Sequence, residues 1–556
     1  MNSRRVLITA ALPYANNRPH LGHVAGVYLP ADTYNRFLKL TGVESIFICG
    51  SDDHGVPITI SAQKEASSPA DVVSKYRSVQ ENVFSSLGIE FDHYSGTSTC
   101  EGHAELAQEF FEKIRERGDI EEKVTDQFRC SSCEMFLPDR YVEGVCPLCD
   151  AKGARGDQCD SCGGAFEQQK LIDPLCVNCG ASPELTSTRH WFFRLDRYEE
   201  RLEQWLESRE GWRDNVKNFS LGTIKNGLPA RCITRDLEWG VPVPLENAND
   251  KVLYVWFDAP VGYISFTREM FRARNQEQEW RSWWADEDVE IVHFLGKDNI
   301  IFHAVIWPAM LLGHGDFQLP GSIPANEYLN FKGEKFSKSR GVGVTADEIL
   351  ELFEADRVRY YLTAIAPEGK DTSFSWEDFI QRNNDELSDV IGNLAHRVFT
   401  FTAKNFDSKV PAGGASSSHA EEVLRVLKEA REEWSAALSK NRFREALEKV
   451  VTLARHGNRI FDAAEPWKSR KSDVEICGRD LAALLEIVHG VSVLLLPFVP
   501  ETAGRLHGAF SDSAAPAAET VGALGTDILL KAGHDVVGPG IVYPRLELPS
   551  EDDSGS

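Results

Sequence analysis

Two histidines near the start of the chain have the spacing of a phosphate-binding pair. His20 and His23 lie in "RPHLGH", residues 18–23, directly after the apolar run of residues 5–12. Side chains at i and i+3 share one face of a helix, and a helix N-terminus favours anions. Two imidazoles there can donate hydrogen bonds to a phosphate, while Gly22 lets a nucleotide base approach the backbone. Such a tetrapeptide also arises by chance among ordinary surface histidines, so it does not decide the matter alone.

A second basic element follows much later, in "NFKGEKFSKSRGVGV", residues 330–344. Ammonium groups on a loop with glycine hinges can swing onto a triphosphate and neutralise a leaving pyrophosphate. The alternative is a solvated basic turn, which is common. The four basic side chains of this loop are Lys332, Lys335, Lys338 and Arg340.

Eight of the twelve cysteines are concentrated in one block as four Cys-x-x-Cys pairs. Each such turn supplies two thiolates, and a tetrahedral zinc ion takes four, so the block predicts two zinc sites. We expect both to be structural, because no catalytic His or Glu accompanies them. The loop between the two inner Cys-x-x-Cys pairs is short. It favours one zinc site built from the two inner pairs and a second site built from the two outer pairs. An interleaved arrangement and a redox dithiol remain alternatives. The inner set is Cys146, Cys149, Cys159 and Cys162, and the outer set is Cys130, Cys133, Cys176 and Cys179.

The order of apolar patterns predicts which elements position these groups. Residues 5–12 and 44–50 read as buried strands, with a helix between them that ends at Gly42. A strand, a helix and a strand at this spacing favour a parallel, doubly wound sheet. The cysteine block interrupts that rhythm, which returns at residues 253–260 and 289–296, and after Ser388 the pattern is helical. We therefore expect an α/β fold with a Rossmann-type parallel sheet, split by a zinc-knuckle connective insertion and followed by an all-α helical bundle.

Charge and hydropathy exclude some classes of protein. The net charge is −25, from 60 basic and 85 acidic residues, which argues against a nucleic-acid binder that ignores sequence and shape. The longest apolar stretch, residues 481–496, is interrupted by Glu486, His489 and Gly490 and fails as a membrane span. The first residues lack the pattern of a signal peptide. We expect a cytoplasmic protein with no membrane contact.

The two basic elements together are the paired signature of class I aminoacyl-tRNA synthetases. The blocks "ALPYANNRPHLGH", "ICGSDDHG", "FLPDRYVEGVCPLC", "YVWFDAPVGYI", "HFLGKDNIIFH" and "KFSKSRG" occur in the order found in one family of that class. Over nearly its whole length the chain resembles the methionyl-tRNA synthetases. Sibling enzymes for valine, isoleucine, leucine and cysteine share the two signatures. The zinc knuckles, "ALPYAN" and "VWFDAPVGY" point to methionine.

The resemblance implies a set of site residues. Asp52 would take the ammonium group of methionine, and Trp256, Tyr263 and His303 would surround the thioether, which gains from aromatic contacts. Arg235 matches a basic residue near the active site. The full methionine set is Leu12, Tyr14, Asp52, Trp256, Ala259, Pro260, Tyr263 and His303. The catalytic residues would be His20, His23, Lys335 and Lys338, and the residues around Mg²⁺-bound ATP would be His20, Gly22, His23, Gly296, Asp298, Lys335, Ser337 and Lys338.

Two positions depart from the family pattern. Phe336 stands where methionine is more usual in the second signature, and it keeps an apolar anchor. Asn299 stands where many bacterial relatives have isoleucine lining the pocket, and an amide there could alter inhibitor sensitivity more than methionine binding.

The resemblance also implies the domains and the partners. An aromatic ring can stack on an unpaired base while Asn and Arg bond its edges, so Asn393, Arg397, Pro466 and Trp467 would read the anticodon. The alternative for Trp467 is a ring that merely caps a helix. The expected partners are L-methionine, ATP and tRNA(Met), with two structural Zn²⁺ ions and a monomeric chain. The expected segments are residues 1–117 and 233–325 (the two Rossmann halves), 118–232 (the connective insertion), 326–387 (the basic loop and stem-contact region), 388–548 (the anticodon-binding domain) and 549–556 (an acidic tail).

Two other functions compete with this one. The nearer is a class I synthetase for another amino acid. The farther is a non-catalytic zinc protein that binds RNA on a synthetase scaffold, and it predicts a lost histidine or lysine in the signatures. All of those residues are present.

Overall fold

The computed structural model covers most of the chain. It describes residues 5–138, 141–156, 159, 161–162, 166, 168–331, 334–335, 343–412, 418–511, 513, 516–526 and 528–547, with backbone only at 334, 335, 418 and 420. Ser337, Phe336 and Lys338 therefore lie outside the described residues, as do the side chain of Lys335 and residues 548–556.

A five-stranded parallel sheet forms the centre of the catalytic part. Its strands are β1 (Arg5–Ala10), β2 (Ser45–Ser51), β3 (His93–Gly96), β13 (Val289–Gly296) and β14 (Ala325–Asn326), in the order β14-β13-β1-β2-β3. β1 and β2 are buried almost throughout, as strands of a sheet covered on both faces must be. From β1 the chain builds the sheet in one direction through β2 and β3, and later in the other direction through β13 and β14. Ligands are therefore expected at this switch point, beyond the carboxyl ends of β1 and β13.

Helices cover this sheet, and the strand expected at residues 253–260 is absent from the described structure. The covering helices include α2 (Leu29–Leu40), α4 (Pro69–Ser86), α5 (His103–Glu116), α9 (Val261–Ala273) and α11 (Trp307–His314). The expected return of the strand pattern holds for 289–296, which is β13. Residues 253–260 instead form the end of the short β12 (Val252–Leu253) and the helix α8 (Val255–Asp258). A short apolar run cannot be assigned to strand or helix by its pattern alone.

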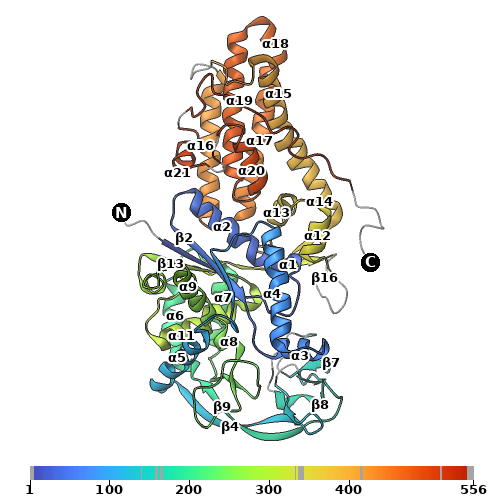
Figure 1. The fold of residues 1–556 in the computed structure, drawn as a ribbon, viewed down its shortest axis with the longest axis vertical. Helices are drawn as coiled ribbons and strands as arrows, with labels where there is room; N and C mark the ends of the chain where they lie inside the picture. The colour runs from blue at the N-terminus through green and yellow to red at the C-terminus, as the bar shows by residue number, and fades with distance from the viewer. Residues whose placement is uncertain are drawn as a thin grey trace.

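The cysteine-rich insertion extends from one end of the molecule. β4 (Ile120–Cys130) and β9 (Glu184–Phe193) pair as a long antiparallel ribbon. Beyond it lies a small sheet of β7 (Lys152–Arg155), β6 (Val142–Val145) and β8 (Ile172–Cys176). Figure 1 shows this insertion at the end of the molecule opposite the C-terminal helices.

The C-terminal region is a helical bundle. It contains α15 (Asn393–Phe406), α16 (Ser418–Leu438), α17 (Phe443–Ala464), α18 (Pro466–Ser472), α19 (Val474–Leu495) and α20 (Pro500–His507). α19 is the central helix, since most of its residues from Cys477 onward are buried. No helix among the described residues is both long enough and apolar enough to cross a bilayer. The split parallel sheet and the helical bundle confirm the predicted fold class.

Candidate active site

The two histidines of the first motif form a compact unit just beyond β1. His20 caps the short α1 (Leu21–His23): the His23 N–H donates to His20 Nδ1 at 3.2 Å, and the His20 N–H donates to His23 Nδ1 at 3.4 Å. Their rings stack with centroids 3.5 Å apart. A Cβ at residue 22 would lie 3.0 Å from the His20 ring, so any side chain larger than that of Gly22 would press on this ring. Because both Nδ1 atoms accept, each neutral ring carries its proton on Nε2, where it can be donated to an anion.

The segment that follows the basic loop is bonded to this unit. The Leu21 N–H donates to Val344 O at 3.4 Å, and the Ala346 N–H donates to Pro19 O at 3.0 Å. His20 and Thr345 form an isolated antiparallel bridge. At the other end of the loop, β16 (Glu334–Lys335) pairs with β15 (Leu329–Phe331), which also borders the histidine unit. Both anchors of the loop that carries Lys335 and Lys338 therefore lie beside the histidines.

The expected methionine residues come together from separate elements. Tyr14, after β1, and Asp52, after β2, form a parallel backbone bridge. The Tyr14 ring meets the edge of Trp256 at 6.4 Å between centroids, and Trp256 stacks on Phe302 at 3.8 Å. Leu12 lies against the start of α9, where a Cβ at residue 262 would be 3.3 Å from it. Ala259 and Pro260 precede that helix and are buried.

Tyr263 and His303 are both buried and are hydrogen-bonded to each other. Burial lowers the pKa of His303 to about 4, so its ring is neutral. Its Nδ1 lies 3.1 Å from Asn299 O, which can only accept, so Nδ1 carries the proton. Nε2 then accepts from the Tyr263 hydroxyl at 2.9 Å. This pair is thus uncharged and aromatic, and aromatic contacts are favourable for a thioether. The backbone carbonyl of Asn299, and not its side-chain amide, thus fixes the tautomer of His303.

Asp52 is an enclosed carboxylate without a cationic partner among the described residues. Only 3% of its surface is exposed, and its side chain accepts a single hydrogen bond, from the His54 N–H at 3.4 Å. Burial raises the pKa of Asp52 well above its ordinary value, and the charges of Asp258 and Asp53 raise it further. A bound ammonium group would offset this cost, because a buried charge is stabilised chiefly by an opposite charge.

Several groups that surround Asp52 escaped the sequence analysis. His54 Nδ1 lies 2.6 Å from Asp258 Oδ2, and Arg77 Nη2 lies 2.8 Å from Asp53 Oδ2. Two of the three neighbouring carboxylates thus have cations, and Asp52 does not. His54 and Asp258 occur in the quoted blocks "ICGSDDHG" and "YVWFDAPVGYI", so their charge was a usable signal. Arg77 lies in the middle of α4, and nothing in its sequence context marks it.

Gly296 and Asp298 lie at the carboxyl end of β13, next to the end of β1. The Tyr328 hydroxyl donates to Asp298 Oδ1, and the neighbouring Lys297 pairs with Glu327 at 2.7 Å. The residues predicted for ATP that the structure describes therefore share one edge of the sheet with His20 and His23.

The eight clustered cysteines form two groups of four. The sulfurs within each group all lie within 4.8 Å of one another, and the groups are the inner and outer sets expected from the loop length. Neighbouring sulfurs from different pairs are 3.5–3.9 Å apart. Four thiolates at about 2.3 Å from one Zn²⁺ would be separated by about 3.8 Å, so both groups fit a closed tetrahedral site.

Comparison with known proteins identifies the family. The family model "tRNA synthetases class I (M)" matches residues 6–399, and "Anticodon binding domain of methionyl tRNA ligase" matches residues 410–553. The chain belongs to the methionyl-tRNA synthetase family. The predicted family is confirmed, and the alternative of another class I family is wrong.

Individual relatives agree with this assignment. The methionine–tRNA ligase of Bacteroides fragilis is 43% identical over 549 residues, which is 98% of this chain and 79% of the relative. That of Thermococcus kodakarensis is 44% identical over 515 residues, 90% of this chain and 69% of the relative. A solved structure of Mycobacterium tuberculosis methionyl-tRNA synthetase in complex with methionyl-adenylate is similar with a TM-score of 0.80, at 28% identity, covering 98% of this chain and 100% of that one.

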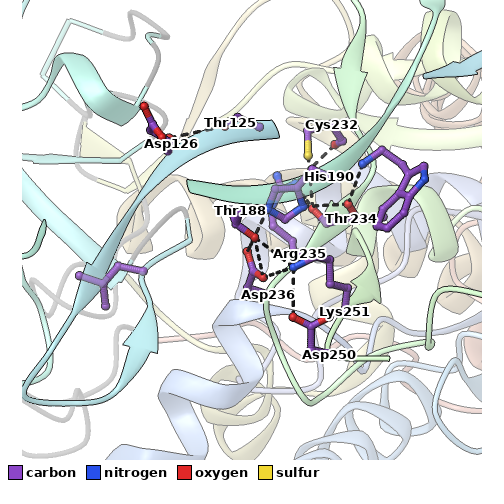
Figure 2. Close-up of polar contacts among 12 residues, drawn as sticks. Thr125, Asp126, Thr188, His190, Cys232, Thr234, Arg235, Asp236, Asp250 and Lys251 are labelled. Atoms are coloured by element: carbon purple, nitrogen blue, oxygen red, sulfur yellow. Dashed lines mark hydrogen bonds and ion pairs between the residues drawn. The ribbon is translucent and has the colours of Figure 1, made fainter. Parts of the chain in front are cut away.

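In this member of the methionyl-tRNA synthetases a buried polar clamp holds the strand that carries Arg235 (Figure 2). β11 (Thr234–Arg235) is followed by Asp236, which lies 2.9 Å from His190 Nε2 and pairs with Lys251. Burial alone would raise the pKa of Asp236, but His190 and Lys251 hold it below its ordinary value. The Arg235 guanidinium lies 3.9 Å from the centroid of the Tyr254 ring, two residues before Trp256. The clamp thus fixes a cation beside the pocket.

The candidate anticodon residues lie on α15 and α18, and α18 is at the free end of the bundle (Figure 1). Arg397 pairs with Asp462 and lies 4.2 Å from the centroid of the Phe461 ring. The Trp467 ring is 6.2 Å from that of Phe461 and is 45% exposed. Asn393 donates to Asn458 at 3.4 Å, and Pro466 is buried at the start of α18. Arg397 and Trp467 thus share Phe461 as a neighbour, and much of the Trp467 side chain is exposed.

Proposed function

We propose that this chain is a methionine–tRNA ligase, which activates L-methionine with ATP and then transfers it to tRNA(Met). The observation that supports the proposal most is the bonding of Leu21 and His20 to Val344 and Thr345. It joins the two signatures at the edge of the sheet where Asp52 lies. The anion donors, the cations of Lys335 and Lys338, and the residues expected to bind methionine can then act on one bound ATP.

In the first step the methionine carboxylate attacks the α-phosphate of ATP, and pyrophosphate leaves. Asp52 binds the substrate ammonium, and Trp256, Tyr263 and His303 enclose the thioether. His20 and His23 donate from Nε2 to the oxygens on which charge develops. Lys335 and Lys338 neutralise the pyrophosphate, whose charge Mg²⁺ shares when bound with ATP. The protein supplies positioning and charge, and no covalent intermediate forms on it.

In the second step the methionyl group passes from the adenylate to the 3′-terminal adenosine of the tRNA, at its 2′-hydroxyl. Trp467 stacks on an anticodon base at the far end of the bundle, and Asn393 and Arg397 bond base edges. Lys468, Arg470 and Lys471 add local positive charge to an otherwise acidic chain.

The two zinc ions are structural, because four thiolates leave no open coordination position. We assign residues 1–117 and 233–325 to the catalytic domain, 118–232 to the insertion, 326–387 to the loop and stem-contact region and 388–548 to the anticodon-binding domain. We further propose a monomer that acts in the cytoplasm.

The test is ATP–pyrophosphate exchange with each of the twenty amino acids, followed by charging of tRNA(Met) transcripts. Methionine alone should support fast exchange, and the transcript with a changed anticodon should be charged poorly. Exchange that is equally fast with valine, isoleucine or leucine, or no exchange with any amino acid, would refute the proposal.

A further inference from the structure

The turn that follows β2 carries Asp52, and the orientation of that side chain depends on His54. Asp52 Oδ1 accepts from the His54 N–H at 3.4 Å. A carboxylate that accepts from the backbone two residues later forms an Asx turn, so the direction of the His54 N–H sets the direction of the Asp52 side chain. Whatever holds His54 in place therefore also holds the carboxylate expected to bind the methionine ammonium.

Two contacts join this turn to α8, the helix that carries Trp256. His54 Nδ1 lies 2.6 Å from Asp258 Oδ2. A Cβ at residue 55 would lie 3.1 Å from Val255 Cβ, and Gly55 has a φ of +87°, so the backbone there favours glycine and approaches α8 closely. Val255 and Asp258 are three residues apart and share one face of α8. That face receives the turn, and Trp256 lies on a different face of the same helix.

The contact between His54 and Asp258 is enclosed. Their side chains are 9% and 0% exposed. The Trp239 ring lies 5.8 Å from that of His54, and Trp239 Nε1 donates to Asp53 O at 2.6 Å. A hydrogen bond to an enclosed carboxylate is stronger than one between neutral groups, so this contact can fix the turn against α8.

The other charged and titratable groups around this contact have partners of their own. The Asp53 carboxylate, next to His54 in the chain, accepts from Arg77 Nη2 at 2.8 Å and from Ser98 Oγ at 2.8 Å. His103, at the start of α5, lies close to both His54 and Asp258. Burial lowers the pKa of His103 to about 3, so its ring is neutral. Neither Asp53 nor His103 therefore replaces Asp258 as the charged partner of His54.

On the basis of the ligase function proposed above, we propose that His54 and Asp258 are positioning residues for methionine binding. The anchor is α8, because most of its residues are buried and α9 follows it within a few residues. Asp258 holds the imidazole of His54, and the N–H of His54 holds the Asp52 carboxylate. The ammonium site is thereby fixed relative to Trp256. A misplacement of about 1 Å in a group that orients a substrate can cost about a hundredfold in rate.

The test compares kcat/KM for methionine in steady-state ATP–pyrophosphate exchange by the full chain. His54→Leu removes the side-chain donor and should lower kcat/KM about 10- to 100-fold, with the KM for ATP unchanged. His54→Asn places an amide N–H where Nδ1 lies and should stay within about threefold of wild type. Asp258→Ala breaks the contact from the other side and should match His54→Leu, so the test does not depend on the folding of a single variant.

Two comparisons separate positioning from a general loss of structure. His93→Leu is the matched control: it breaks a similar contact, at 2.8 Å from Glu269 on α9, and should stay within about twofold of wild type. Adding His54→Leu to Asp52→Asn should lower kcat/KM by less than a further factor of about three, because the contact that His54 positions is already lost.

Three results would overturn the proposal. They are wild-type kinetics in His54→Leu, a loss in His54→Asn as large as in His54→Leu, and a double variant in which the two single losses multiply. Exchange by the wild-type chain tests the ligase function itself, so an active enzyme that is indifferent to His54→Leu would refute the positioning role alone.

Discussion

His20 and Thr345 are joined by an antiparallel backbone bridge, although one follows the first strand of the sheet and the other follows the basic loop. Arg18 reinforces the junction by pairing with Asp347 at 2.6 Å. The loop that carries Lys335 and Lys338 is therefore tied at its end to the helix cap that presents His20 and His23. Charged groups from distant parts of the chain can stabilise one transition state only if they lie close together, as this junction allows.

The first prediction concerns His23 and Lys338. Replacing either with alanine should lower the rate of adenylate formation about 100- to 1,000-fold, because each removes a donor or charge that acts in the transition state. The KM for methionine should change less than about threefold. Steady-state ATP–pyrophosphate exchange at varied methionine concentrations measures both quantities. Lys332→Ala, in the same loop, is the matched control and should stay within about threefold of wild type. A loss confined to methionine affinity would contradict the assigned roles.

Asp52→Asn should act on methionine binding. The amide keeps the shape of the carboxylate but loses its charge, so the KM for methionine should rise about 30- to 1,000-fold. The KM for ATP should hardly move. Asp71→Asn, at the exposed start of α4, is the control. If methionine and methioninol bound to the Asp52 variant as tightly as to wild type, the ammonium site would lie elsewhere.

The pair of His54 and Asp258 predicts a pH-dependent stability. Burial would lower the pKa of His54, but the Asp258 carboxylate outweighs it and raises the pKa above its ordinary value of 6.5. The stability from the charged pair is thus complete below pH 6.5 and is lost as pH rises through the folded-state pKa. Asp258→Asn should therefore lower the Tm more at pH 6 than at pH 8.5. Scanning calorimetry at the two pH values tests this, and an equal decrease in Tm at both would contradict a charged pair that is lost between them.

Zinc binding can be tested one knuckle at a time. Cys146→Ser and Cys176→Ser should each lower the zinc content of the purified chain from two ions to one, since each removes a ligand of a different group. Cys100→Ser, whose thiol is not part of either group, should retain both ions. Elemental analysis gives the content. Retention of both ions in either variant, or loss of both from a single substitution, would contradict two independent sites.

Trp467→Ala should separate charging from activation. Loss of base stacking should raise the KM for tRNA(Met) about 10- to 100-fold, while ATP–pyrophosphate exchange stays unchanged. Ile476→Ala, another exposed apolar side chain near the same end of the bundle, is the control. A wild-type KM for tRNA in the Trp467 variant would favour the simple helix-capping alternative.

Local patterns in the sequence predicted the parts of this site that depend on local structure. The strand around residues 5–12 appears as β1, and the loop between the inner cysteine pairs correctly indicated how the eight thiols group. Residues 253–260 were misassigned because a short apolar run is compatible with both a helix and a strand. The contact of His54 with Asp258 and the clamp on Arg235 join residues far apart in the chain, so no local pattern could reveal them.

A crystal structure of the full chain with ATP and methioninol, which lacks the carboxylate and cannot react, would show whether both signatures act on one nucleotide. We predict that Nε2 of His20 and His23 and Nζ of Lys338 lie within hydrogen-bonding distance of the phosphates of one ATP, with the methioninol ammonium on Asp52. A nucleotide bound away from these imidazoles, or a loop that reaches a different surface, would contradict it.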